Sequence, residues 1–472
     1  MQTTRLFSKI VEKIVRGVVS FVRNRIRRLG ESNVLKVIAV LVVLLVIPTL
    51  LFIHSKQNNK NTESPAISTA PSVTSEDPAD TSSDPGDVLG NAITPEPETE
   101  ATTTEAVKPV ETTEAPAQDP SETEPEELDK VEYIDLIAVG DNLYHLSITN
   151  AGKQPDGTYN YDSIYENIKG FISEFDIKVI NQEIPLTDDP SKWTGFPVFG
   201  GPLQAADAIA DAGFNVVTHA TNHSMDQGKD TALKELEYWK TKEDVIVSGM
   251  YTSQEDYDNI DIGEYKGVKV AFLNYTYGLN GYSVPKDAPY LVKTLNIDRV
   301  TEDIAKAKEL ADIVIVFPHW GEEYITTPSA YQKDMARKIA EAGADAIIGC
   351  HPHIIQPLEI LKTSEGKEVP CFYSLGNFIS NMPRAERCVE CMAHLRIKKD
   401  GNDVSIDYVE AIPMVNYYTP NFTDYTVYMA SDYSDEIAKT HRNPDVTPRY
   451  VNTFFNNIFT IRYYELGSSP NR

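Results

Sequence analysis

The stretch VVTHATNHSMDQG at residues 216–228 joins an apolar run to an unusual density of polar side chains. Val216–His219 predicts a buried β-strand, and the residues after the stretch show the periodicity of a helix. Asn222, His223 and Asp226 stand between the two, where one capping residue would suffice to start the helix. The stretch therefore predicts a strand–loop–helix unit whose loop carries a functional site.

The same alternation of strand-like and helix-like segments continues on both sides of this stretch. Further strands are predicted at Tyr133–Val139, Lys178–Ile180, Val270–Leu273, Ile313–Phe317 and Ala346–Ile348. Helices are predicted at about 163–175, 203–212, 229–240, 298–311 and 329–342, and later strands at about 369–375, 391–398 and 404–410. This alternation predicts an α/β fold with a mostly parallel sheet covered by helices and an antiparallel section late in the chain.

More polar clusters directly follow other predicted strands. They are Gly140-Asp141-Asn142, Asn181-Gln182-Glu183, His319-Trp320-Gly321 and His351-Pro352-His353. Taken singly, each has a structural explanation, such as a turn aspartate or a hydrogen-bonded core histidine. In open α/β sheets, however, ligand sites gather at the carboxyl ends of the strands. Mixed carboxylate, amide and imidazole groups there indicate a hydrolytic dinuclear site for Mn, Fe or Zn, with Glu183 as a bridging carboxylate and Asn181 orienting it.

The composition argues against several classes of protein. The net charge of −27 argues against a nucleic-acid partner, because binding to a phosphate backbone rests on clustered Lys and Arg. The same charge makes a polyanionic ligand unfavourable unless cations bridge it to the protein. The 4 cysteines are too few for a disulfide scaffold, and Cys388-x-x-Cys391 is interpreted as a strand edge or one local disulfide.

The first 130 residues differ in composition from the rest. Residues 1–33 are basic with apolar side chains at every fourth position, which indicates an amphipathic helix on the inner membrane leaflet or a helix that binds another membrane subunit. Residues 34–54 are apolar and predict a single transmembrane signal anchor rather than a cleaved signal peptide. The preceding basic residues place the N-terminus in the cytoplasm and the C-terminal domain outside the cell. Residues 55–130, acidic and rich in Thr, Pro, Ser and Glu, predict a disordered linker.

In their order, the polar clusters resemble the CapA family of capsule and poly-γ-glutamate biosynthesis proteins, which looks like a branch of the calcineurin-like metallophosphatase superfamily. The resemblance covers about 133–412 and extends to further matching segments: Glu322-Glu323-Tyr324, Gln356 and Tyr373-Ser374-Leu375-Gly376-Asn377-Phe378. It implies a four-layer α/β/β/α metallophosphatase sandwich over residues 131–415. Residues 416–472 form a C-terminal extension to which no role is assigned.

The resemblance also implies a set of metal ligands. Two divalent ions would be bound by Asp141 and His353 at one position, by Asn222, His319 and His351 at the other, and by Glu183 bridging both. Typical metallophosphatases carry a histidine two residues after the first aspartate, and here Leu143 stands at that place. The first ion would therefore lose one ligand.

Catalytic roles are implied for two residues of the opening stretch. A water activated by the ions would attack in line, and His223, tuned by Asp226, would protonate the leaving group or hold its oxygen. One hypothesis is therefore a membrane-anchored, extracytoplasmic metal-dependent hydrolase acting on an anionic cell-envelope polymer or its precursor, in capsule or poly-γ-glutamate biosynthesis. The alternative is a non-catalytic polymer-binding or export subunit of a membrane synthase complex. Aromatic residues that would line the cleft in either case are Trp193, Phe196, Phe199, Trp320 and Tyr324.

Overall fold

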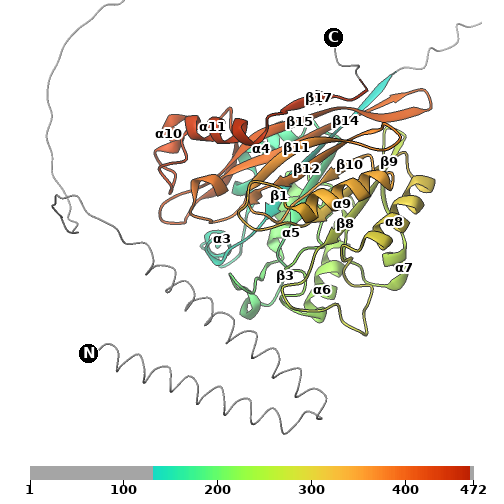
Figure 1. Ribbon diagram of the computed structural model, residues 1–472. Helices are drawn as coiled ribbons and strands as arrows, with labels where there is room; N and C mark the ends of the chain where they lie inside the picture. The colour runs from blue at the N-terminus through green and yellow to red at the C-terminus, as the bar shows by residue number, and fades with distance from the viewer. Residues whose placement is uncertain (1–130, 468–472) are drawn as a thin grey trace, which may run out of the picture. The chain divides into compact units, whose positions relative to one another are not determined.

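The computed structural model describes residues 131–467, which fold into β-sheets covered by helices (Figure 1). This α/β fold confirms the predicted class. The predicted basic segment, transmembrane anchor and acidic linker lie outside the described residues. From residue 131 to residue 467, no helix has both the length and the apolar composition needed to span a membrane.

The large sheet has a parallel half and an antiparallel half. Its main path is β16 (Tyr425–Met429), β15 (Asp403–Tyr418), β14 (Val389–Asp400), β1 (Glu132–Asn142), β2 (Ile177–Gln182), β5 (Val216–Thr218) and β6 (Ile246–Ser248). Off this path, β13 (Asn377–Ile379) pairs with β1, and β17 (Tyr463–Glu465) pairs with β15. The strands β1, β2, β5 and β6 pair in parallel, whereas β14, β15 and β16 are antiparallel, as predicted for the late part of the chain.

The small sheet is parallel at its centre. Its order is β11 (Ile355–Lys362), β12 (Glu368–Leu375), β10 (Ala346–Ile348), β9 (Ile313–His319), β8 (Val268–Thr276) and β7 (Asp261–Tyr265). The edge strands β11 and β7 are antiparallel to their neighbours. A separate pair is formed by β3 (Leu186–Thr187) and β4 (Gly201–Pro202).

Strand β8 shows how the small sheet lies between two apolar layers. Val270 and Phe272 belong to the core cluster that also contains the buried residues of β1 and β2. The alternating residues Ala271 and Leu273 belong to a second cluster with residues of α8 (Ile297–Leu310) and α9 (Ala330–Glu341). Because side chains alternate across a strand, one face of the small sheet packs on the large sheet and the other on these helices.

Helix boundaries follow local capping chemistry. Ser329 and Gln332 form a capping box at the start of α9, and the side chain of Asn296 caps α8. Helix α5 ends at Gly213, whose left-handed φ of 99° suits glycine. The other helices are α3 (Leu146–Ala151), α4 (Glu166–Ile172), α5 (Gln204–Ala212), α6 (Lys229–Trp239), α7 (Gln254–Asp258), α10 (Asp435–Ala438) and α11 (Pro448–Ile458). Short 3₁₀ turns lie at η1 (Asp162–Ile164), η2 (Pro190–Lys192) and η3 (Ala385–Arg387).

The C-terminal extension is continuous with the large sheet. Strand β15 runs through Tyr418, so it crosses the boundary predicted at residue 415, and β16 and β17 pair with it. Helix α11 buries Val451 and Phe455 in the same core cluster as the large sheet. The four cysteines are buried and unpaired, so the proposed local disulfide is wrong, and Cys391 lies on β14.

Candidate metal centre

The side chains predicted as metal ligands all lie where strands end. Asp141 is the second-last residue of β1, Glu183 follows β2, Asn222 lies in the loop after β5, His319 ends β9, and His351 and His353 follow β10. Their exposed fractions run from 0% to 3%, so all are removed from bulk water. The parallel halves of both sheets thus bring residues from distant parts of the chain to one place.

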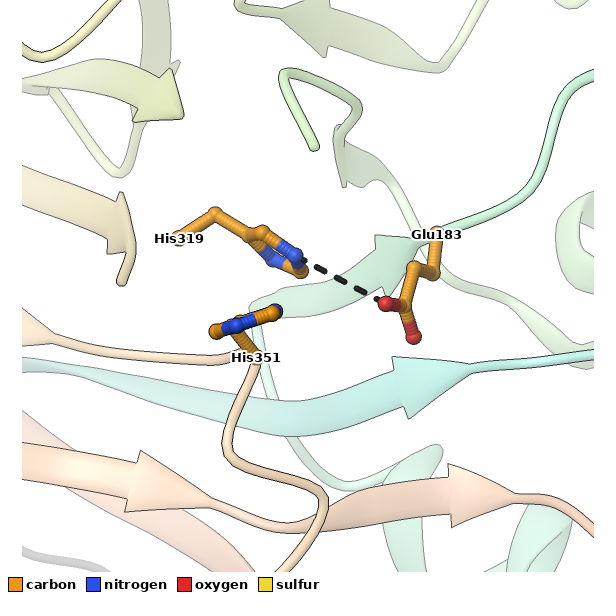
Figure 2. A group of neighbouring side chains, drawn as sticks. All are labelled: Glu183, His319 and His351. Atoms are coloured by element: carbon orange, nitrogen blue, oxygen red, sulfur yellow. Dashed lines mark ion pairs between the residues drawn. The ribbon is translucent and has the colours of Figure 1, made fainter. Parts of the chain in front are cut away.

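Two groups of three side chains offer ligand atoms that all lie within 4.8 Å of one another. One consists of Glu183, His319 and His351, and the other of Asp141, Glu183 and His353. In Figure 2 the Glu183 carboxylate and the His319 and His351 rings point toward a shared space. Glu183 belongs to both groups, so one carboxylate lies between two candidate ion positions. Asn222 adjoins the first group, with Oδ1 2.7 Å from Nε2 of His319.

Glu183 has a buried carboxyl group that makes no hydrogen bond. Its carboxylate is fully buried and neither oxygen has a hydrogen-bond partner. Oε1 lies 3.6 Å from Nε2 of both His319 and His353. Burial raises the pKa of Glu183 well above its ordinary value; the Asp141 charge adds to this and His353 opposes it. A buried carboxylate without hydrogen bonds is unfavourable, and a cation placed among these atoms would satisfy it.

The histidines differ in their charge. Burial lowers the pKa of His319 and His351 well below the ordinary value, and neighbouring imidazoles add to the effect. Both rings are therefore neutral, the form that binds metal. His353 is different: burial lowers its pKa, but the charge of Glu183 and the charge and hydrogen bond of Asp141 outweigh burial and raise the pKa to about 9. Two neutral imidazoles and two buried carboxylates fit a divalent cation, and His353 would have to lose a proton to join them as a ligand.

Asp141 is held by bonds to both of its oxygens. Asn181 donates from Nδ2 to Oδ1 at 2.8 Å, and the backbone N–H of His351 donates to Oδ2 at 3.2 Å. The prediction that Asn181 orients Glu183 is therefore wrong, since Asn181 binds the neighbouring carboxylate. Glu183 is anchored through its backbone, where its carbonyl accepts from the Thr221 hydroxyl at 2.6 Å.

The loop that carries His351 and His353 is strained. These residues have φ of 100° and 55°, a left-handed region that non-glycine residues adopt at a cost. Asn377 supports the loop, since its Oδ1 lies 3.1 Å from Nδ1 of His353 and its Nδ2 donates to the His353 carbonyl at 3.3 Å. The backbone N–H of Asn377 in turn donates to Glu390 at 2.7 Å. The sequence placed Asn377 in a matching segment without a role and gave no signal for Glu390.

Gly140 allows the end of β1 to touch the turn before β13. A Cβ at this position would lie 2.1 Å from the carbonyl oxygen of Gly376. The backbone N–H of Asp141 donates to that same oxygen at 3.0 Å. The Gly-Asp sequence is thus required because two backbones meet directly beside the first candidate ligand.

His223 and Asp226, the predicted catalytic pair, form a short contact of 2.6 Å between Nδ1 and Oδ2. The same Asp226 oxygen accepts the backbone N–H of Phe199 at 2.7 Å, and the Phe199 ring packs edge-on against His223 with centroids 4.7 Å apart. Asp226 therefore fixes the proton on Nδ1 and leaves Nε2 free. Asn280, which sequence reasoning missed, accepts from Asn222 Nδ2 at 3.2 Å; its only signal was the turn-forming Asn280-Gly281 pair.

Leu143 and His145 do not add a ligand to either group. Leu143 has an exposed fraction of 1% and belongs to the apolar core. His145 places Nδ1 3.3 Å from the Leu143 carbonyl and packs edge-on against Phe199, and burial lowers its pKa to about 4. The first candidate ion position thus has only Asp141, Glu183 and His353 among the described histidine, cysteine and carboxylate side chains.

Of the five aromatic residues predicted to line the cleft, two contact residues of the candidate centre and three have other surroundings. Trp320 is fully buried beneath the site and donates from Nε1 to the Tyr373 carbonyl at 3.0 Å. Trp193 packs on Tyr159. Phe199 contacts His223, and the ring of Tyr324 lies 6.1 Å from that of His353, so these two adjoin the candidate centre. The fifth, Phe196, is exposed over 75% of its surface and lies 6.4 Å from Phe199.

The sequence is similar to proteins of capsule synthesis. It is 31% identical over 216 residues to the PGA biosynthesis protein CapA of Bacillus subtilis (strain 168), a match that covers 44% of this chain and 55% of that protein. It is 30% identical over 257 residues to the capsule biosynthesis protein CapA of Bacillus anthracis, covering 52% of this chain and 60% of that protein. The matches thus span between 55% and 60% of these relatives.

Among solved structures, the fold is similar to the NAD nucleotidase NadN of Haemophilus influenzae, with a TM-score of 0.39 and 14% identity, covering 61% of this chain and 50% of that chain. The family model described as bacterial capsule synthesis protein PGA_cap matches residues 135–382, which contain every predicted site residue. Because this match covers more than half of the 472 residues, the chain belongs to the PGA_cap family of bacterial capsule synthesis proteins.

Proposed function

We propose that this protein is a membrane-anchored, extracytoplasmic metal-dependent phosphoesterase of capsule or poly-γ-glutamate biosynthesis. The observation that carries the proposal is the pair of ligand groups that share Glu183, whose buried oxygens have no other partner. In the arrangement we propose, Asp141 and His353 bind one divalent ion, and Asn222, His319 and His351 bind the other. Mn, Fe and Zn all suit this mixture of nitrogen and oxygen donors. The two packed sheets with helices outside are compatible with a four-layer metallophosphatase sandwich.

In the proposed reaction, each residue of the site has a separate role. Bound ions supply Lewis acidity, which lowers the pKa of an attacking water and neutralises charge on the transferring oxygens. Glu183 and Asp141 contribute fixed negative charge that holds the cations. His223 donates a proton from its imidazole to the leaving oxygen. Asp226 accepts a hydrogen bond from Nδ1 of His223 and so keeps the ring in the orientation that this proton transfer needs. Phe199 covers one side of His223 and keeps solvent from that ring.

The proposed partner is an anionic cell-envelope polymer or its precursor. The basic and apolar residues 1–54 support anchoring in the cell membrane with the N-terminus in the cytoplasm. Residues 55–130 would then extend the folded part away from the membrane surface. Membrane synthase subunits are the proposed protein partners of the N-terminal segment.

One observation favours the second candidate function, a non-catalytic subunit that binds or exports polymer. Leu143 stands where a further ligand for the first ion would lie, and the described histidine, cysteine and carboxylate side chains offer no replacement. A site with one firm and one weak ion position can bind an anionic polymer through a cation without hydrolysing it.

The experiment measures metal content and turnover together. The full-length chain is purified in detergent, loaded with Mn²⁺ or Zn²⁺, and assayed with bis(p-nitrophenyl) phosphate. We expect two bound ions, with His319→Ala and His223→Ala each reducing turnover, the first with metal loss and the second without it. His394→Gln is the matched control, because His394 pairs with Asp135 near the opposite end of β1. Metal-loaded protein that binds polymer but shows no turnover with any phosphodiester would contradict the hydrolase and favour the second candidate.

A further inference from the structure

Arg387 carries an unpaired guanidinium beside the candidate metal centre. It ends the 3₁₀ turn η3, directly before β14. Its Nε is buried without a hydrogen-bond partner, and among residues 131–467 the guanidinium donates no side-chain hydrogen bond and pairs with no carboxylate within 4.0 Å. An arginine has five N–H donors in a planar fork, and leaving the buried Nε–H without an acceptor is unfavourable.

The ring of Tyr324 lies between Arg387 and the candidate centre. The guanidinium carbon lies 3.5 Å above the centroid of the Tyr324 ring, and that ring lies 6.1 Å from the ring of His353 with an interplanar angle of 31°. A guanidinium on an aromatic face is held by cation–π attraction and keeps its edge available for hydrogen bonds. The stack therefore fixes the position of the cation without using its donors.

The backbone of both stacked residues is tied to the loop that carries the histidines. Tyr324 has a left-handed φ of 67°, and its N–H donates to the Pro352 carbonyl at 2.7 Å. The Arg387 carbonyl accepts from Asn377 Nδ2 at 3.4 Å, the side chain that also contacts His353. Arg387 is thus placed relative to the centre by the same asparagine that supports His353.

Acidic and basic residues lie near Arg387, but no carboxylate of residues 131–467 forms an ion pair with it within 4.0 Å. A groove of about 820 Å³ adjoins η3 and carries Arg384 and Arg449 together with Glu386 and Asp445, so its charges are mixed. Glu323 precedes Tyr324 but is exposed, where solvent screens its charge. Arg387 therefore differs from the groove arginines in being fixed on a ring next to the candidate centre.

The geometry points to Arg387 as a binding site for an oxyanion of the substrate, one unit along from the group held at the metal centre. The ligand class is a chain with repeated carboxylate or phosphate groups, which the planar fork of an arginine binds in a bidentate manner. The substrate class rests on the proposed function. The unpaired Nε–H of Arg387 and its contact with the Tyr324 ring are independent of that function. Arg387 would make the protein prefer a charged polymer over a neutral one of the same length.

The test is equilibrium binding of two fluorescent oligomers to the full-length chain in detergent, with EDTA and with Mn²⁺. One probe is a γ-linked glutamate oligomer and the other an oligomer of glycerol phosphate, which distinguishes carboxylate from phosphate. A γ-linked glutamine oligomer is the neutral reference. For whichever charged probe binds more tightly, we expect Arg387→Gln to weaken binding about tenfold or more and Arg387→Lys to restore part of the loss. Neither change should alter binding of the neutral oligomer.

Arg442→Gln is the matched control. Arg442 also lies over an aromatic ring, 4.2 Å from the centroid of Phe422, and its loss changes the net charge by the same amount. Its substitution should leave binding within about twofold of the unchanged protein. Equal losses in Arg387→Gln and Arg442→Gln, or no loss in either, would overturn the inference. Because no step of the test needs turnover, an inactive protein that still shows the Arg387 effect would refute only the hydrolase proposal.

Discussion

Asn377 holds the His353 ring from the side away from Glu183: its Oδ1 lies 3.1 Å from Nδ1, while Nε2 of the same ring lies 3.6 Å from Glu183. An imidazole that donates its Nδ1 proton to an amide oxygen is fixed in the tautomer that offers Nε2 to a metal. The asparagine therefore helps to orient a candidate ligand that lies in a strained loop, together with Asp141, whose Oδ2 lies 3.2 Å from the same Nδ1.

Replacing Asn377 with alanine should weaken metal binding by about 10- to 100-fold, the usual effect of removing a side chain that orients a ligand. The measurement is a competitive titration of Mn²⁺ or Zn²⁺ against a chelating dye, with circular dichroism to verify folding. Asn416→Ala is a suitable comparison, because Asn416 is also buried but donates to Ser380 instead. Equal metal affinity in the protein and in Asn377→Ala would mean that the loop holds His353 without help.

Glu183→Gln should have opposite effects on the two states of the protein. Without metal, the substitution removes a buried carboxylate that makes no hydrogen bond and whose cost of burial outweighs its 3.6 Å ion pair with His353, so Tm in EDTA should rise, by an amount that corresponds to about 1–3 kcal/mol. With metal, the bridging charge is lost and the added ion should no longer stabilise the fold. Thermal melts with and without Mn²⁺ distinguish the two effects. A Tm that falls in EDTA would show that the ion pair with His353 outweighs the cost of burying the carboxylate.

Metal removal should lower stability measurably. A ligand present at 100 times its Kd stabilises the native state by about 2.7 kcal/mol, so chelation should lower Tm by several degrees. His319→Ala should abolish the difference between the melts with metal and with EDTA. His394→Gln should retain it, because His394 bonds Asp135 away from the candidate ligands. If His319→Ala keeps the full metal response, the binding site lies elsewhere.

Asp226→Asn should lower turnover about 100-fold or more while leaving metal content unchanged. The carboxylate contacts Nδ1 of His223 at 2.6 Å, and an amide cannot stabilise the charged imidazole in the same way. The measurement is kcat over a range of pH with bis(p-nitrophenyl) phosphate, together with elemental analysis of the bound ions. Turnover that falls in step with metal loss would assign Asp226 a structural role instead.

The pair of His219 and Glu235 should make stability depend on pH. Burial alone lowers the pKa of His219, but the charge and hydrogen bond of Glu235 at 2.9 Å and the Gln182 carbonyl outweigh it, so the pKa is raised above 6.5. The stabilisation is fully present below about pH 6.5, the unfolded value, and is lost as pH rises through the higher folded value. Tm in EDTA should therefore fall over that interval, and less so in His219→Gln. Identical pH profiles for the two proteins would contradict the assignment.

The sequence by itself determined the order of the main strands and helices and the positions of the polar clusters. Apolar runs such as Ile313–Phe317 and the polar residues directly after them are local patterns, and a strand's carboxyl end can be located from them. The predicted elements therefore agree with β1, β2, β5, β8, β9 and β10 to within a few residues. Short elements such as β3 and β13 were missed, because two or three residues carry too little periodicity.

Only the tertiary structure decided which side chain supports which. The Asp141 carboxylate accepts from the His351 backbone across 210 residues, and Asn181 binds Asp141 rather than its near neighbour Glu183. Arg387 beside Tyr324 is another such contact. No local pattern contains these distances, since they follow from how two sheets pack and where their loops meet. The sequence thus identifies the candidate ligands of the centre. The packing of the two sheets determines which side chains and backbone groups hold those ligands in place.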